Sequence, residues 1–148
     1  MRGGQVVVLR ELFAFAIGIM VMLGVIYIFD SIISPELSRF SLNEQAYSIL
    51  FHVNSLLEKS SFLSRSLADA SLSIVERMPD NIADHTYSVY AFGNELCIKT
   101  RGVTVMVNCI NTTLDADISG DYSSGNDLII NASFINDSLV LVFESYVV

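Results

Sequence analysis

Apolar residues dominate one stretch near the start of the chain, residues 12–29, which contains no charged side chain. A helix rises about 1.5 Å per residue, and the hydrocarbon core of a bilayer is about 30 Å thick. The stretch, extended to Ile33 with Asp30 near its edge, is therefore long enough to cross a membrane. A cleaved secretory peptide has a shorter apolar core that ends in a small-residue site, and no such site follows Phe29.

Charged residues are distributed unequally around this stretch. Arg2 and Arg10 precede it, whereas Asp30 and Glu36 follow its apolar core. Basic residues gather on the cytoplasmic side of membrane helices. The pattern therefore predicts a single-pass membrane protein with a cytoplasmic N-terminus and an extracellular C-terminus.

A second helical pattern begins at Ser34, which is followed by Pro35, a pair typical of a helix start. Either a new helix begins here or the first one continues with a kink. Apolar or small residues then recur at steps of three and four, which predicts an amphipathic stalk helix over residues 34–78. The members of this stripe are Ile49, Val53, Leu56, Ser60, Leu63, Leu67, Ala70 and Ile74.

Such a stalk helix would be far longer than the helices of ordinary globular proteins, so a small domain would not cover it. Two explanations remain open. The stripe packs against the same helix of neighbouring subunits, or the helix breaks near Ser60 and Ser61 and packs under the C-terminal domain.

From His85 onward the hydrophobic period changes to two and β-forming residues become frequent. Gly93-Asn94 and Arg101-Gly102 are typical of tight turns between strands. The expected fold is α+β: a long N-terminal transmembrane and stalk helix, then a small antiparallel β-sheet or sandwich head. This extracellular β domain covers residues 79–148, with strands at residues 86–92, 95–100, 103–110, 127–134 and 138–148.

Charge and sequence motifs argue against several classes of function. The 148 residues carry a net charge of -8, and no basic patch is present, which argues against nucleic acid as a partner. No nucleophile elbow, glycine-rich phosphate loop, CxxC pair or histidine pair on one helix face occurs, and His52 and His85 each lack a second ligand at metal-binding spacing. We therefore expect no enzymatic activity and no cofactor.

Cys97 and Cys109 are the only cysteines. An even number of cysteines outside the cytoplasm favours a disulfide. A two-residue turn at Arg101-Gly102 would pair Cys97 with Met106, which leaves the cysteines three positions out of register. A disulfide therefore requires a bulge near Asn108 or a wider loop.

Three N-glycosylation acceptor patterns occur in the part that the topology places outside. They begin at Asn111, Asn131 and Asn136. If modified, Asn131 and Asn136 must present their amides outward from the sheet.

One acidic, glycine-containing segment is a weak candidate for a calcium loop. Asp115, Asp117 and Ser119 supply oxygen atoms at alternate positions, and Gly120 follows where such loops turn tightly. Asn126 occupies the place of the usual glutamate. A solvated connection is the alternative interpretation.

Arg2, Gly4 and Gln5 directly precede the apolar helix. This arrangement resembles the class III signal peptide of archaeal type IV pilin-like proteins, which a membrane peptidase cuts before the apolar segment. The resemblance implies a leader peptide at residues 1–4, cleavage between Gly4 and Gln5, and a transmembrane and filament-core helix at residues 5–33.

The same resemblance implies a structural subunit of an archaeal type IV pilus-like surface filament. Identical subunits would assemble through their N-terminal helices, and the exposed head, a glycoprotein domain, would have an adhesion-type role. The implied partners are the membrane, identical subunits, a leader peptidase and the assembly machinery. The alternative is an uncleaved bitopic envelope protein that acts as an accessory or stator subunit of a membrane machine.

Overall fold

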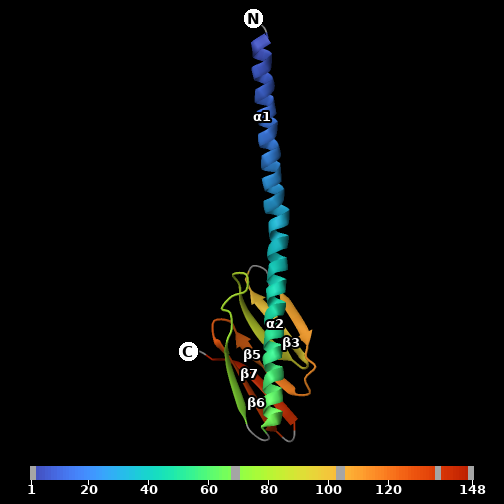
Figure 1. The fold of residues 1–148 in the computed structure, drawn as a ribbon, viewed down its shortest axis with the longest axis vertical. Coiled ribbons are helices and arrows are strands. Elements are labelled where there is room, and N and C mark those ends of the chain that lie inside the picture. Colours follow the sequence, from blue (N-terminus) through green and yellow to red (C-terminus); the bar gives the residue numbers. More distant parts are fainter. Residues whose placement is uncertain (1–2, 68–70, 103–105, 136–137, 147–148) are drawn as a thin grey trace. The chain divides into compact units, whose positions relative to one another are not determined.

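The chain divides into two units, Met1–Phe40 and Ser41–Val148. The computed structural model describes residues 3–67, 71–102, 106–135 and 138–146. Helical segments precede a seven-stranded sheet, which confirms the expected α+β fold (Figure 1). Each unit is described separately below.

The first unit contains α1 (Gly3–Ile28), the π-helical turn η1 (Phe29–Ile33) and the first residues of α2 (Ser34–Ser66), most of which belongs to the second unit. Proline lacks a backbone N–H, and its ring clashes with the carbonyl four residues earlier in an α-helix. A π-helical turn directly before Pro35 widens the spiral at this place. Ser34 accordingly has helical dihedral angles (φ -60°, ψ -46°), and its N–H donates to the Phe29 carbonyl. The helix therefore continues past Pro35, and no new helix begins there.

The second helix is shorter than the sequence predicts. α2 ends at Ser66, and the strand β1 occupies Leu72–Arg77, so the stalk helix predicted over residues 34–78 is wrong at its C-terminal end. Ile74 fits a helical period and also the two-residue alternation of β1, in which every second residue is more buried. Pairing with β6 decides between them, because it satisfies the backbone of this β-branched segment. Ala70 lies outside the described residues.

Seven strands form one sheet in the order β1-β6-β7-β5-β2-β3-β4. Neighbouring strands are antiparallel except β5 and β7, which are parallel. The sheet is thus mixed rather than wholly antiparallel, and the described strands do not form a sandwich. The remaining strands are β2 (Thr86–Phe92), β3 (Glu95–Arg101), β4 (Val107–Asn111), β5 (Asp117–Ser123), β6 (Asp127–Ile135) and β7 (Ser138–Tyr146).

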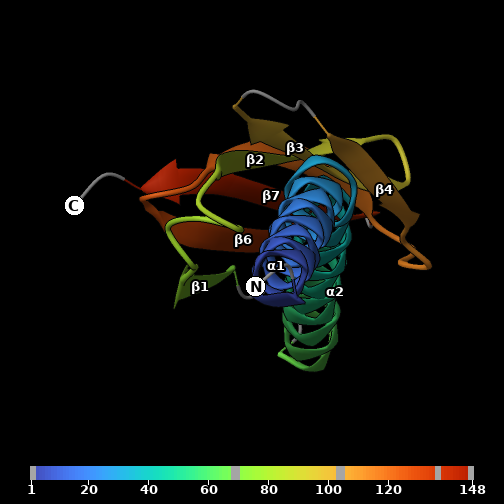
Figure 2. The same cartoon turned by 90° about the horizontal axis from the view of Figure 1, so that it is seen from above.

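The hydrophobic core lies between α2 and one face of the sheet, and the strands curve partway around this helix (Figure 2). Ile49, Val53, Leu56 and Ser60 of the predicted stripe are buried in the same chain. Packing of these four residues on neighbouring subunits is therefore wrong, whereas Leu63 and Leu67 of the same stripe are exposed. Packing under the C-terminal domain is right, but α2 runs unbroken through Ser60 and Ser61.

Polar contacts also join α2 to the sheet and its loops. The Asn108 amide of β4 donates to Asn43 at 2.9 Å, and Gln45 accepts from the Ala83 N–H at 3.0 Å. These contacts fix the position of α2 on the sheet beyond what apolar packing alone defines.

Two tyrosines are buried at the centre of the sheet. The rings of Tyr87 and Tyr122 have centroids 6.1 Å apart. Their hydroxyls donate to the carbonyls of Pro79 (2.7 Å) and Asn126 (2.9 Å). Burial, which disfavours the phenolate, is the main cause that raises the pKa of each tyrosine above its usual value.

Candidate functional site

The helix that includes α1 is long and apolar enough to cross a membrane, by length and composition. Within the described chain, none of its most apolar 18-residue window is buried. Large apolar side chains such as Phe15, Met20 and Tyr27 are each more than 70% exposed. They project on all sides of α1, so the helix has no polar face for water. This is consistent with the expected single-pass membrane protein.

Gly4 and Gln5, the residues expected to flank a leader cleavage site, lie in the first turns of α1. The backbone is helical there, so the candidate scissile bond is part of the same helix as the apolar segment. Cleavage between these residues stays a prediction.

Cys97 of β3 and Cys109 of β4 form the expected disulfide. The two residues face each other directly, since Lys99 pairs with Val107 and the Thr100 N–H donates to the Met106 carbonyl at 3.0 Å. The two-residue turn assumed from the sequence is therefore wrong. A connection three residues longer brings the cysteines into register, which is the wider loop that the disulfide requires.

Two of the three glycosylation candidates have accessible side chains. Asn111 is exposed at the end of β4. Asn131 of β6 is partly exposed between the buried residues Ile130 and Ala132, so its amide points away from the core as modification requires. Asn136 lies outside the described residues. Attachment of a glycan stays a prediction.

The calcium loop expected around Asp115, Asp117 and Ser119 is not formed. Asp117 and Ser119 belong to the extended strand β5, whose backbone pairs with β7, so their oxygen atoms do not surround a common centre. Gly120 lies against the Phe143 backbone instead of forming a turn. Among the described residues, the group of acidic and cysteine side chains whose ligand atoms lie close together includes Cys97 and Cys109. The sulfur atoms of these two residues are bonded to each other in the disulfide.

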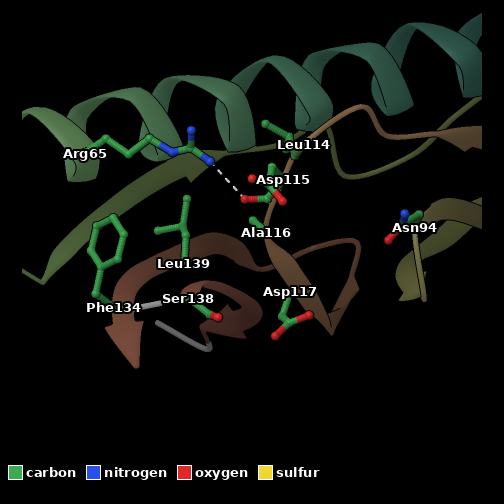
Figure 3. Close-up of a pocket in the computed structure, with 9 residues that line it drawn as sticks. All are labelled: Arg65, Asn94, Leu114, Asp115, Ala116, Asp117, Phe134, Ser138 and Leu139. Atoms are coloured by element: carbon green, nitrogen blue, oxygen red, sulfur yellow. Dashed lines mark hydrogen bonds between the residues drawn. The ribbon is translucent and has the colours of Figure 1, made fainter. Parts of the chain in front are cut away.

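A cavity of about 470 Å³ opens where the C-terminal end of α2 meets the sheet (Figure 3). Arg65 of α2 extends across it, and its Nη2 donates to the backbone carbonyl of Asp115 at 2.9 Å. The other lining residues come from the β2–β3 turn, the segment before β5 and the ends of three strands. They are Asn94, Leu114, Asp115, Ala116, Asp117, Phe134, Ser138 and Leu139.

Sequence reasoning missed this cavity because its lining residues come from segments that are distant in the sequence. The spacing of the acidic residues Asp115 and Asp117 instead predicted a metal-binding loop. Arg65 lies within the predicted stalk helix, and nothing in the sequence places it beside Asp115.

A row of exposed phenylalanines lies on the side of α2 opposite the core. Phe51 and Phe62 are 62% and 72% exposed, and about three helical turns separate them. Ser55 and Glu58 lie between them on the same side of α2, and we call these four residues the outer stripe. The helical spacing of Phe51 and Phe62 is visible in the sequence, but it does not show which side of α2 the sheet leaves uncovered.

Comparisons with known protein families, with curated proteins and with solved structures gave no match.

Proposed function

We propose that this protein is a structural subunit of a cell-surface filament of the archaeal type IV pilus-like kind. In this proposal α1 first lies in the membrane and then packs with the equivalent helices of other subunits. The exposed apolar surface of α1, which nothing in the described chain covers, carries the proposal.

The magnitude of this exposure supports the argument. Burying one large apolar side chain is worth about 1.5–3 kcal/mol. The exposed side chains of α1 include Leu12, Phe13, Ile17 and Leu23 among many others, so leaving all of them in water would cost tens of kcal/mol. A typical domain is stable by only about 5–15 kcal/mol. Either lipid or other helices must therefore surround α1.

The outer stripe supports packing between subunits. Because its own sheet covers the opposite face of α2, Phe51 and Phe62 remain free for another copy. Aromatic side chains are enriched in protein interfaces and bury a large area each. A second copy that covers the outer stripe would remove both rings from water.

The alternative function is an uncleaved bitopic envelope protein in a membrane machine. The helical backbone at Gly4 and Gln5 favours it, since a peptidase must first open this helix to reach the bond between them.

The mass of the intact protein, isolated from the cells that produce it naturally, separates these two functions. Filament subunits should begin at Gln5 and should be visible as filaments by electron microscopy of the cell surface. A protein that retains Met1 and stays in the membrane fraction would contradict the filament proposal and favour the alternative.

A pair of matched variants tests the interface. The double variant Phe51→Ser, Phe62→Ser should abolish filaments, whereas Phe92→Ser should not, although Phe92 is also exposed (77%). Near-ultraviolet circular dichroism checks that both variants keep a folded head. Filaments of normal number from the double variant would exclude the outer stripe as an interface.

A further inference from the structure

The cavity beside Arg65 has the chemistry of a ligand site, and neither the membrane helix nor the outer stripe uses it. We propose that this cavity binds a neutral sugar unit. Its volume of about 470 Å³ lies within the range of known small-molecule sites, about 300–1,000 Å³.

The polar groups of the cavity complement hydroxyl groups. The carboxylates of Asp115 and Asp117 accept hydrogen bonds, and the side chains of Asn94 and Ser138 both donate and accept. Arg65 is held in place by its bond to the Asp115 carbonyl, and a guanidinium has further N–H donors for a ligand oxygen. A sugar hydroxyl, which donates one hydrogen bond and accepts others, fits this mixture.

An aromatic ring lies at the opposite side of the cavity from Asn94. Phe134 is 37% exposed, and its ring lies below Arg65 beside Leu139 (Figure 3). The face of an aromatic ring carries partial negative charge, which attracts the C–H groups on the apolar face of a sugar ring. Phe134 therefore adds an apolar surface to the polar groups that line the cavity.

The charges of the lining exclude other ligand classes. Two aspartates against one arginine disfavour an anion, and Arg65 beside Asp115 disfavours a divalent cation. A wholly apolar ligand would leave the carboxylates and the amide without partners. A neutral ligand with many hydroxyl groups satisfies the lining without these costs.

Assembly is not required for this binding. Every lining residue belongs to the unit Ser41–Val148, so the sugar site and the filament proposal can fail separately.

Saturation-transfer NMR on the full chain in lipid nanodiscs tests the proposal, because nanodiscs avoid detergents with sugar headgroups. The probes are glucose, galactose, mannose and N-acetylglucosamine at millimolar concentration. At least one probe should receive saturation from the protein. Asp117→Asn and Phe134→Ala should each weaken its binding about tenfold, as expected for one lost charged hydrogen bond or ring contact.

Matched controls come from the same sheet. Asp121→Asn changes an exposed aspartate of the same strand, and Phe92→Ala changes an exposed ring of β2, both outside the cavity. Both controls should bind as the parent does. If a cavity variant fails to fold, Asn94→Ala is measured in its place, because Asn94 lies in an exposed turn.

Three outcomes would overturn the proposal. They are no transfer to any of the four sugars, equal binding by cavity and control variants, and preferential binding of calcium or inorganic phosphate at these residues.

Discussion

Gly120 of β5 is the position where the sheet should be most sensitive to a single added methyl group. Its φ is +144°, and a Cβ built there would lie 2.8 Å from both the N and C atoms of Phe143 in the parallel strand β7. Gly120→Ala must therefore adopt a strained backbone and also push β5 away from β7.

The expected magnitude follows from these two effects. Backbone strain in a region that essentially only glycine occupies costs about 1–3 kcal/mol. Displacing the strand weakens neighbouring ladder hydrogen bonds, each worth about 1 kcal/mol. We expect Gly120→Ala to lower the free energy of unfolding of the head by about 4 kcal/mol, a large part of the roughly 5–15 kcal/mol typical of a domain.

Gly125→Ala is the matched control. Gly125 also has a positive φ, +88°, but a Cβ there meets nothing within 4 Å. It should cost only the backbone strain, about 1–2 kcal/mol, and the effect of alanine on the unfolded chain cancels between the two variants. Urea unfolding of the full chain in nanodiscs, followed by tyrosine fluorescence, measures both. Equal destabilisation by the two variants would refute the steric argument.

Two other predictions concern the head. The double variant Cys97→Ser, Cys109→Ser removes a link across 12 residues and should lower stability by about 3 kcal/mol in urea unfolding; an unchanged midpoint would contradict this. Burial raises the pKa of Tyr87 in the folded state, so the folded head binds this proton more tightly. Stability should therefore fall as pH rises above about 10. Tyr87→Phe should flatten this fall, whereas parallel alkaline unfolding curves would exclude Tyr87 as the cause.

Much of the fold follows from local patterns. The sequence predicts β2 with the bounds that the structure has, and Tyr87, Val89 and Ala91 lie in or against the core at the period of two expected for a strand. The predictions failed where two periods fit the same residues. Ile74 continues the helical stripe and also fits strand β1, and only pairing with β6 decides between them. β5 was missed because its polar, glycine-containing sequence has no alternation of hydrophobic residues.

The candidate site was less predictable than the fold for a physical reason. The capacity of a helix to cross a membrane depends on the length and composition of one continuous segment, so it can be seen directly in the sequence. The cavity depends on the arrangement of α2 on the sheet, which places Arg65 beside Asp115, fifty residues later in the chain. The disulfide was partly predictable. The number of cysteines predicted the bond, but the length of one loop determined the register in which β3 and β4 pair.

The distribution of the core separates the roles of the two units. Every buried apolar residue of the described chain lies from Leu42 onward, within the second unit. A helix with so many exposed apolar side chains favours association or membrane insertion over a free monomer in water. The free energy that holds α1 must therefore come from outside the chain, from lipid or from other copies. The cavity, in contrast, is lined only by residues of the second unit, so its shape depends on the fold of the head.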